Sequence, residues 1–382
     1  MTSECDIVYL SRTPWDSLYQ RPQHLAAGLA GLQRVLYVDT PRSTFNRRFL
    51  RPLLKRQPVR PLLSQPAPGL TVLSPAYVPF LPGWWPPPGQ YRLHRLFLRW
   101  AMRRLGMASP ILWAQDPRDL YFVEAVAPRL VCYDCMDDYA LIAPPGVSRS
   151  ALRAQELAML RRADLVFASA GDLQRRCSQT NAHVVLVPNG VDAARFGAAP
   201  APADVAAIAR PRLGYVGAIA PWLDFGLLET LAQARPQLSL VLVGPVQRAV
   251  RARVAALQRL PNVHILGERP YVDVPAYMHS FDVCLIPFLV NDLTRAVNPV
   301  KFWEYMAAAR PVVTTALPEL LPYADVCTVA SDAQTFIAGV DTALSARAEV
   351  EQAQRRLALV RVNSWAQRVQ TIEDALAAAL AA

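Results

Sequence analysis

This sequence contains almost no lysine. Of its 40 basic residues only Lys55 and Lys301 are lysines, which leaves 38 arginines (40 − 2). Arginine is so frequent that any one arginine says little about function, whereas a lysine needs an explanation. The formal net charge is +10, but no recognised nucleic-acid-binding module surrounds the basic residues, so we expect no nucleic-acid partner.

Long apolar runs and paired cysteine motifs are also missing. No run of 18 or more uncharged apolar residues occurs, and no basic segment followed by an apolar one opens the chain. We therefore predict no transmembrane helix and no signal peptide. Cys132 and Cys135 form a CxxC without a second CxxC or paired histidines. Zinc or redox use is the weaker alternative, and reduced thiols in a cytoplasmic protein are the prediction.

The sequence does contain a regular alternation of short apolar runs and helical patterns. The 382 residues are 53% hydrophobic and 18% charged, which suits two globular domains. Apolar strands that alternate with helices predict parallel sheets covered on both faces. In the first half the predicted strands are 6–10, 34–39, 70–73, 111–114, 130–134, 165–168 and 183–187. In the second half they are 213–216, 238–243, 263–266, 283–286, 312–315 and 326–329.

These two series predict an α/β protein with two Rossmann-like, doubly wound domains facing a cleft. We place the domains at residues 1–198 and 199–362, because residues 196–211 form an Ala/Pro-rich stretch typical of a linker. One long helix is predicted over residues 349–381, and residues 363–382 are expected to pack back on the first domain. Ligands of such sheets bind at the carboxyl ends of the strands, so the cleft is the expected site.

One region combines basic and aromatic residues. Residues 44–60 are rich in arginine, residues 80–88 contain two tryptophans, and residues 91–104 place Leu, Phe and Trp among arginines at helical spacing. Such a surface is typical of a peripheral contact with the anionic inner face of the plasma membrane. The alternative is a helix whose apolar side packs on the first sheet.

The segment around the second lysine carries the predicted chemistry. Pro299 suits a first helical turn, which puts Lys301 near a helix N-terminus, where a cation is otherwise disfavoured. Free backbone N–H groups and a lysine together bind phosphate well. Glu304 follows on the same side of the helix, where a carboxylate can accept both hydroxyls of a ribose. These residues predict a nucleotide site, and the alternative is an ordinary surface ion pair.

This segment, Pro299-Val-Lys-Phe-Trp-Glu-Tyr-Met-Ala307 followed by Pro311-Val-Val, resembles the donor-site motif of GT-B glycosyltransferases of the set called glycosyl transferases group 1. It is most similar to a bacterial branch with the pattern PxKxxEYxAxGxPVV, which includes teichuronic-acid and exopolysaccharide enzymes. Further similar motifs extend over nearly the whole chain. They include Trp15 with Gln20-Arg-Pro-Gln-His24, Tyr133-Asp-Cys-Met-Asp-Asp138, Pro188-Asn-Gly-Val-Asp192 and Gly214-Tyr-Val-Gly217.

The sequence departs from this family at three places. Ala296 stands where the family has a glutamate that contacts the donor sugar, and Asn298 is the nearest polar substitute. Asp224 lies near the place of a missing lysine, and Ala309-Arg310 replaces the usual Ala-Gly. These departures leave the donor sugar and a retaining mechanism open, and they affect the nucleotide site less.

Three aspartates, Asp134, Asp137 and Asp138, follow an apolar strand of the first domain. An inverting transferase needs a general base that takes the proton of the acceptor hydroxyl. The segment also resembles the inverting, xanthan-type glucuronosyltransferases, and in that comparison Asp137 falls on the base position. Asp137 is therefore the predicted catalytic base, and the alternative is helix capping by these aspartates.

Other positions complete the predicted site. Gly217 would let the backbone approach a pyrophosphate, Glu268 would accept hydrogen bonds from the base or ribose, and Phe288 would stack on the base. The alternatives are a plain turn, a loop and a core residue. Arg12 and Arg21, in the first loop, are predicted to meet acceptor phosphate.

The resemblance implies a metal-independent hexosyltransferase without a cofactor. It would move a sugar from a nucleotide-sugar donor, UDP-linked, to a hydroxyl of a glycan or lipid-linked intermediate in cell-surface polysaccharide synthesis. A dinucleotide-dependent oxidoreductase or epimerase is disfavoured, because the first strand ends in Leu-Ser-Arg-Thr-Pro-Trp and not in G-x-G-x-x-G. The remaining alternative is a catalytically silent nucleotide-sugar-binding protein.

Overall fold

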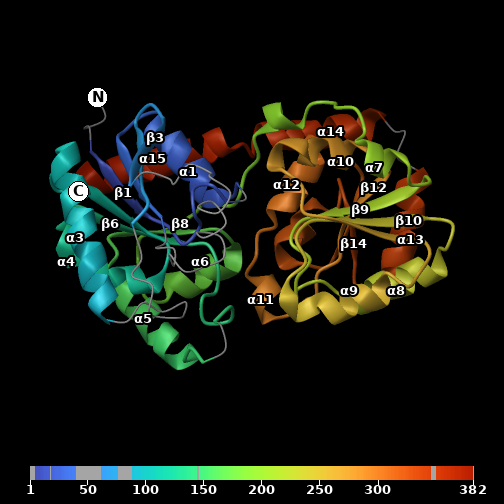
Figure 1. Ribbon diagram of the computed structural model, residues 1–382, viewed down its shortest axis with the longest axis horizontal. Helices are drawn as coiled ribbons and strands as arrows, with labels where there is room; N and C mark the ends of the chain where they lie inside the picture. The colour runs from blue at the N-terminus through green and yellow to red at the C-terminus, as the bar shows by residue number, and fades with distance from the viewer. Residues whose placement is uncertain are drawn as a thin grey trace, which may run out of the picture. The chain divides into compact units, whose positions relative to one another are not determined.

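The computed structural model describes residues 5–17, 19–39, 62–75, 88–143, 146–345 and 350–381. The chain divides into two compact units, which we call the first unit (Met1–Pro188 with Arg368–Ala382) and the second unit (Asn189–Gln367). Each unit is built around one sheet (Figure 1). Among the described residues, no helix has the length and apolar character that a membrane span requires.

The first unit contains an eight-stranded sheet with the order β3-β4-β2-β1-β5-β6-β7-β8. All neighbouring strands are parallel except β3, which pairs antiparallel with β4 at one edge. The strands are β1 (Ile7–Leu10), β2 (Val35–Val38), β3 (Leu63–Ala67), β4 (Leu70–Leu73), β5 (Ile111–Ala114), β6 (Leu130–Cys135), β7 (Leu165–Ala168) and β8 (Val184–Leu186).

The helices of this unit connect successive strands, as parallel pairing requires. They are α1 (Arg21–Ala30), α3 (Pro88–Leu105), η1 (Pro117–Phe122), α4 (Val123–Val126), α5 (Arg149–Arg162) and α6 (Gly171–Ser178). Most of α15 (Trp365–Ala381) also belongs to the first unit. It packs closely on α1, since a Cβ built on Gly28 would lie 2.4 Å from Cγ2 of Val369.

The second unit contains a six-stranded, fully parallel sheet with the order β11-β10-β9-β12-β13-β14. This is the doubly wound order, in which β10 and β11 are added on one side of β9 and β12, β13 and β14 on the other, so that the strand order reverses between β9 and β12. The strands are β9 (Arg212–Val216), β10 (Ser239–Val243), β11 (Val263–Gly267), β12 (Val283–Ile286), β13 (Val312–Thr315) and β14 (Thr328–Ala330).

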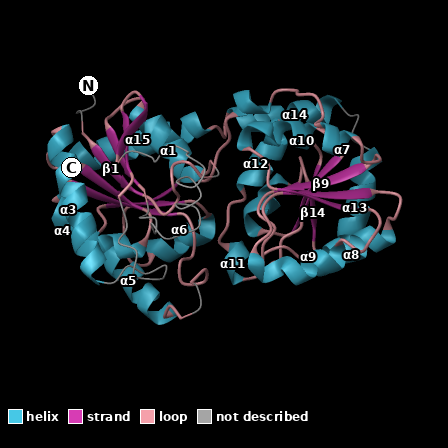
Figure 2. Ribbon diagram, in the orientation of Figure 1, coloured by secondary structure: helices cyan, strands magenta, loops and turns pink. Residues whose placement is uncertain are grey.

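Helices lie above and below these strands (Figure 2). They are η2 (Ala193–Phe196), α7 (Ala203–Ala206), α8 (Phe225–Ala234), η3 (Arg248–Val250), α9 (Arg251–Leu257), η4 (Tyr271–Asp273), α10 (Val274–His279), α11 (Asp292–Arg295), α12 (Val300–Ala307), η5 (Pro318–Tyr323), α13 (Ala333–Ser345) and α14 (Val350–Arg361). Strands covered on both faces are buried along their whole length, and every residue of β9, β10, β12 and β13 is buried.

The packing of the second sheet leaves no room at one strand residue. A Cβ built on Gly214, in β9, would lie 1.9 Å from the ring of Phe281. Atoms never approach so closely, so Phe281 takes the space that a side chain at position 214 would need. The glycine is required for this packing and not for backbone flexibility.

The α/β prediction with two doubly wound units is confirmed, and each predicted strand overlaps an observed one. The structure differs from the prediction at three places. The edge strand β3 was not predicted. The long helix over residues 349–381 is wrong as one helix, because α14 ends at Arg361 and α15 begins at Trp365. The predicted linker at 196–211 contains the short helix α7 and belongs to the second unit, which begins at Asn189.

Candidate active site

The switch point of the second sheet lies between β9 and β12, and ligands of doubly wound sheets bind outside the carboxyl ends of the strands at such a point. Gly217 directly follows β9, and Lys301 in α12 lies beside it. A Cβ built on Gly217 would be 3.3 Å from Cε of Lys301 and 2.7 Å from the hydroxyl of Tyr215. The structure therefore brings the predicted glycine and the predicted lysine together.

A second glycine, which the sequence analysis missed, keeps this edge open. Gly244 directly follows β10, has φ +147°, and a Cβ on it would lie 1.9 Å from the carbonyl oxygen of Gly217. Only glycine allows these two backbones to approach each other. The signal in the sequence was a glycine immediately after an apolar strand, the same signal that pointed to Gly217.

Lys301 and Glu304 form an ion pair on α12. Nζ of Lys301 lies 2.7 Å from Oε2 of Glu304, whose side chain is only 2% exposed. Oε1 of Glu304 accepts a hydrogen bond of 3.1 Å from the hydroxyl of Tyr271. Burial, followed by the nearby Glu304 carboxylate, raises the pKa of Tyr271 well above its ordinary value. Glu304 is thus a buried carboxylate held from two sides.

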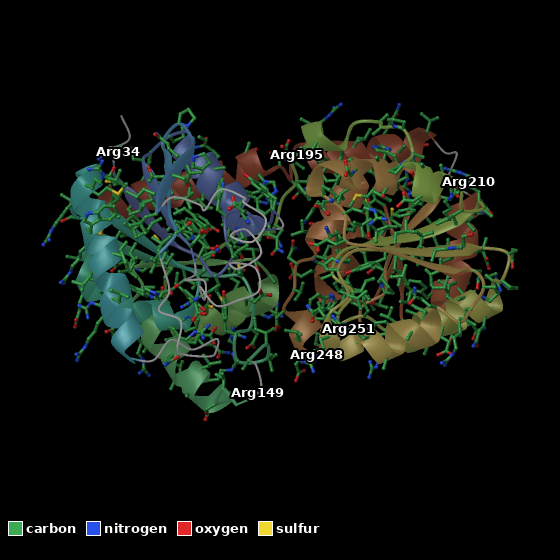
Figure 3. All side chains as sticks on the ribbon, viewed as in Figure 1. Arg34, Arg149, Arg195, Arg210, Arg248 and Arg251 are labelled. Atoms are coloured by element: carbon green, nitrogen blue, oxygen red, sulfur yellow. The ribbon has the colours of Figure 1, made fainter. Side chains whose placement is uncertain are left out.

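Tyr271 was not predicted, because its contact with Glu304 spans 33 residues of sequence. Its ring is covered by a cation: the guanidinium of Arg195 lies 5.9 Å from the ring centroid. Arg195 also pairs with Asp192 at 2.8 Å. Figure 3 labels Arg195 and five other arginines, and all six of these residues are exposed.

Asn298 lies in a buried hydrogen-bond network. Its Oδ1 accepts from the backbone N–H of Asn189 and from Nε1 of Trp303, both at 3.2 Å, and its Nδ2 donates to Glu319 at 3.0 Å. The residue is 5% exposed. These contacts tie the start of the second unit to α12 and η5, so the placement favours a structural role, and donor contact by Asn298 stays a prediction.

Two other predicted donor residues lie in different surroundings. The ring of Phe288 is 7% exposed and packs edge-on against Tyr215, with ring centroids 6.3 Å apart, which favours the core alternative over stacking on a base. Glu268 is exposed at the end of β11, and within the described part of the chain its carboxylate makes no hydrogen bond or ion pair. It is available to a ligand, as the prediction requires.

The three aspartates after β6 take three different positions in the first unit. Asp134 is fully buried and pairs with Arg21 at 2.8 Å. Asp138 is 3% exposed and accepts hydrogen bonds from the backbone N–H groups of Ala140 and Leu141, at 3.1 and 3.2 Å. The capping alternative therefore describes Asp138, although it caps a turn and not a helix.

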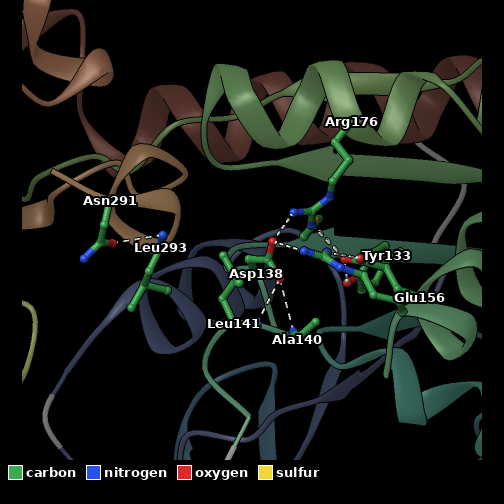
Figure 4. Close-up of polar contacts among 10 residues, drawn as sticks. Tyr133, Asp138, Ala140, Leu141, Glu156, Arg176, Asn291 and Leu293 are labelled. Carbon is green, nitrogen blue, oxygen red and sulfur yellow. Dashed lines mark hydrogen bonds and ion pairs between the residues drawn. The ribbon is translucent and has the colours of Figure 1, made fainter. Parts of the chain in front are cut away.

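Two arginines from neighbouring helices hold Asp138. Arg153 on α5 and Arg176 on α6 both pair with its carboxylate, and both also pair with the buried Glu156 (Figure 4). Figure 4 also draws a separate contact of the second unit, in which Asn291 accepts from the backbone N–H of Leu293 and caps α11. The Asp138 network fixes the loop that carries Asp137.

Asp137 differs from its neighbours because its carboxylate makes no hydrogen bond or ion pair with any described residue. It is half-buried. Burial raises its pKa to about 7, the carboxylates of Asp134 and Asp138 add to this effect, and Arg21 opposes it. An unpaired carboxyl with a pKa near neutrality suits a general base.

Both arginines predicted on the acceptor side are ion-paired. Arg12 lies 3.1 Å from Asp116 and 2.8 Å from Asp119, and Arg21 is 3% exposed and also donates to the carbonyl of Val187 at 2.7 Å. Burial raises the pKa of Asp119 to about 6, against the effect of Arg12. This placement gives no support to a phosphate contact, which stays a prediction for both arginines.

In the described part of the chain, no group of three or more His, Cys, Asp or Glu side chains could hold a metal ion. Cys132 and Cys135 are both buried free thiols.

The chain resembles known proteins in sequence. Residues 210–346, all within the second unit, match the family model described as glycosyl transferases group 1. The putative teichuronic acid biosynthesis glycosyltransferase TuaH of Bacillus subtilis (strain 168) is 29% identical over 254 residues. That match covers 62% of this chain and 64% of the relative, which is less than two thirds of the relative's length.

Solved structures resemble the whole chain in fold. Sucrose-phosphate synthase from Thermosynechococcus elongatus has a TM-score of 0.74 at 15% identity and covers 99% of both chains. Anabaena Alr3699/HepE in complex with UDP and glucose has a TM-score of 0.65 at 16% identity, with 97% and 99% covered. A trehalose-6-phosphate protein from E. coli bound with UDP-2-fluoro glucose has a TM-score of 0.70 at 12% identity, with the same coverage. These likenesses show that the chain has the GT-B fold.

Proposed function

We propose that this chain, which the comparisons support as a group 1 glycosyltransferase of the GT-B fold, transfers a sugar from a UDP-linked donor to an acceptor hydroxyl. The observation that carries the proposal is the approach of Lys301 to the bare backbone at Gly217, at the switch point of the second sheet. Two solved structures with this fold are described as bound to UDP and glucose or to UDP-2-fluoro glucose, which supports the same donor here.

The second unit would hold the donor through Lys301 and Glu304. Lys301 and the first turn of α12 would bind the diphosphate and stabilise the charge that develops as it leaves, without a metal ion. Lys301 is paired with Glu304 at 2.7 Å. Because Tyr271 also holds Glu304, that carboxylate stays in place when Lys301 turns to phosphate, and its other lone pairs can accept ribose hydroxyls.

The first unit would supply the base. Asp137 would accept the proton of the acceptor hydroxyl as that oxygen attacks the anomeric carbon of the donor. Since its pKa lies at about 7, the fraction of base-competent carboxylate, and with it the transfer rate, should rise as pH passes through that value. Asp137→Asn should lower the rate of transfer by about 10²–10⁴.

The donor site is tested by UDP affinity, measured by isothermal titration calorimetry. Lys301→Met keeps the side-chain stem and removes the charge, and it should weaken UDP binding at least about tenfold, since charged hydrogen bonds are worth about 1.5–3 kcal/mol. Glu304→Gln should also weaken binding. Glu229→Gln, an exposed glutamate on α8, is the matched control and should bind like the native protein. Unchanged affinity in Lys301→Met would contradict the phosphate role.

A catalytically silent nucleotide-sugar-binding protein is the second candidate. It is favoured by the buried Ala296, which stands where the similar family has a glutamate that contacts the donor sugar. Release of UDP from UDP-hexoses separates the two candidates. An enzyme releases UDP in a reaction that Asp137→Asn slows. Tight UDP-sugar binding with no UDP release from any UDP-hexose would favour the silent protein.

The acceptor is proposed to be a glycan or lipid-linked intermediate of cell-surface polysaccharide synthesis, reached at an anionic membrane surface. The name of the Bacillus relative supports the polymer class. The membrane contact rests on α3, where an apolar groove of about 270 Å³ is lined by Leu62, Leu93, Leu96, Phe97 and Trp100. Leu96 is 62% and Trp100 44% exposed, and the exposed Arg92, Arg99, Arg103 and Arg104 lie on the same helix. The neighbouring basic and tryptophan-containing segments of the prediction, 44–60 and 80–87, lie outside the described residues.

Sedimentation with vesicles tests this contact. Apolar side chains beside arginines should bind vesicles of phosphatidylglycerol and not of phosphatidylcholine alone. The double variant Leu96→Ser/Trp100→Ser should lose most of this binding. Leu157→Ser, which changes a leucine of 43% exposure on α5, is the matched control and should retain it. Equal vesicle binding by the double variant and the control would show that α3 does not contact the membrane.

A further inference from the structure

Several buried side-chain polar atoms of the first unit have no hydrogen-bond partner among the described residues, and two of them lie on the loops at the carboxyl ends of β5 and β6. They are the hydroxyl of Tyr139, a residue 6% exposed, and Oε1 of Gln115, a residue that is fully buried. An unpaired polar atom in the interior is costly, and native proteins satisfy nearly all such atoms with protein, water or ligand. At the edge of a sheet where ligands bind, such atoms can pair with a polar ligand.

These atoms lie on loops that follow two neighbouring strands. Gln115 directly follows β5, Tyr139 follows β6, and the switch point of the first sheet lies next to them, between β1 and β5. The carboxyl ends of parallel strands share one edge, where doubly wound sheets bind their ligands. Gln115 is fixed there, because its Nε2 donates to Asp134 at 3.3 Å and to the hydroxyl of Tyr9 at 3.1 Å.

Asp137 belongs to the same group. The hydroxyl of Tyr139 lies in the electrostatic field of Asp137, Asp116 and Asp119 and of Arg12, although it bonds to none of them. Nε2 of Gln115 also contacts Sδ of Met136, the residue before Asp137, at 3.7 Å. A phenol, an amide oxygen and a carboxylate that have no partner among the described residues thus lie at one edge of the sheet.

The charges around this edge define the ligand. The three arginines near it are all paired with carboxylates: Arg12 with Asp116 and Asp119, Arg118 with Asp116, and Arg21 with Asp134. A phosphate or carboxylate ligand would have to break such a pair. Hydroxyl groups need no such exchange, because each one donates to an amide oxygen or carboxylate and accepts from a phenol.

We infer that the loops after β5 and β6 form a binding site for a neutral polyhydroxyl group, a sugar ring of the acceptor, in which Tyr139 and Gln115 bind ring hydroxyls beside Asp137. The inference rests on the proposed function and replaces the acceptor phosphate expected at Arg12 and Arg21 with uncharged hydroxyls. Tyr139 is a positioning residue here: it orients the acceptor, and Asp137 takes the proton.

The experiment measures UDP release from UDP-glucose with added methyl glycosides. Methyl glucoside, methyl galactoside and methyl N-acetylglucosaminide are the neutral probes, and methyl glucuronide is the acidic one. At least one neutral glycoside should accelerate UDP release more than the acidic one. Tyr139→Phe should raise the KM for that glycoside at least about tenfold and leave the KM for UDP-glucose unchanged. Gln115→Glu, which replaces the side-chain amide of Gln115 by a charged carboxylate, should also raise the KM for the glycoside.

Tyr133→Phe is the matched control. Tyr133 is equally buried in β6, but its hydroxyl already bonds to Glu156 at 3.4 Å. This variant should keep the native KM for the glycoside.

An unchanged glycoside KM in Tyr139→Phe, or a preference for the acidic glycoside, would overturn the inference and would mean that only buried water satisfies these atoms. If UDP binds with native Lys301 dependence and no glycoside changes UDP release, the inference fails while the donor proposal stands. If the native protein does not bind UDP, the proposed function itself is contradicted.

Discussion

At the scale of single residues, the loop after β6 shows that identical side chains take different roles when their partners differ. Asp134 is neutralised by a buried arginine, Asp138 caps a turn and is held by two arginines, and Asp137 has no partner in the described chain. Arginines contact the first two carboxylates, and backbone N–H groups also bond to Asp138. Burial without a partner instead stabilises the protonated form of Asp137.

This difference predicts how stability changes with pH. The pKa of Asp137 is about 7 in the folded protein and about 4 for an ordinary aspartate. Between these values the unfolded chain loses a proton that the native protein keeps, so ionisation favours unfolding and native stability falls as pH rises. Below about pH 4 and above about pH 7 the effect is constant. Asp137→Asn removes it, so the melting temperature of this variant relative to the native protein should rise from pH 4 to pH 7 and then level off.

Differential scanning fluorimetry at half-unit pH steps measures this effect. Asp172→Asn is the control, because the side chain of Asp172 on α6 is partly exposed and pairs only with Arg175 on the same helix among the described residues. A difference in melting temperature between Asp137→Asn and the native protein that stays flat from pH 4 to pH 8 would show that Asp137 is ionised throughout.

Residues whose interaction partners are close in the chain could be predicted from the sequence. Lys301 and Glu304 are three residues apart on one helix, and their ion pair follows from helical spacing alone. The hydrogen-bond network of Asn298 could not be predicted, because its partners Asn189 and Glu319 lie 109 and 21 residues away in the sequence. No local pattern announces such a network, so the sequence shows only a polar residue beside a motif.

At the scale of secondary-structure elements, glycine marks where the strands of the second sheet meet other groups. Gly214 within β9 leaves space for the ring of Phe281, Gly217 leaves space for the side chains of Tyr215 and Lys301, and Gly244 leaves space for the backbone of Gly217. Gly214→Ala would put a methyl group where the Phe281 ring lies, and overpacking of a core costs about 1–3 kcal/mol or more. We expect Gly214→Ala to lower the free energy of unfolding by at least about 3 kcal/mol.

Gly226 in α8 provides the contrasting substitution. A Cβ there would meet only Oδ1 of Asp224, at 3.4 Å, which is an ordinary contact. Alanine is favoured over glycine inside a helix by up to about 1 kcal/mol, so Gly226→Ala should leave the protein equally stable or more stable. Urea unfolding of both variants measures the contrast. Equal stability of the two variants would show that the second sheet relaxes around position 214.

The periodicity of the sequence identified the strands better than the helices and edges. Buried parallel strands are apolar on both faces, so their residues form continuous runs that are easy to recognise. The edge strand β3 (Leu63–Ala67) has no fully buried residue and contains Pro66, so nothing in its pattern suggests a strand. The break between α14 and α15 depends on Asn363, whose Nδ2 bonds to the carbonyl of Leu359, and on Ser364, whose hydroxyl accepts from the backbone N–H of Gln367. Both residues also occur inside helices, so the break was not visible in sequence.

At the scale of the whole molecule, the chain consists of two sheets with separate cores, and the proposed function divides between them. The residues proposed to hold the donor, Lys301, Glu304 and Gly217, all lie in the second unit, whereas Asp137 and Tyr139 lie in the first. Donor binding should therefore stabilise one unit directly. A ligand present at 100 times its Kd stabilises the state it binds by about 2.7 kcal/mol.

Hydrogen exchange followed by mass spectrometry tests this division. Saturating UDP should slow exchange in peptides that cover the ends of β9 and β10, residues 267–271 and α12, because opening of these segments must first release the ligand. Peptides that cover β6 and residues 136–141 should exchange at the same rate with and without UDP, since the nucleotide carries no acceptor sugar. Lys301→Met should abolish the protection at UDP concentrations that saturate the native protein. Protection that centres on residues 136–141 and spares α12 would move the donor site to the first unit and contradict the assignment of Lys301.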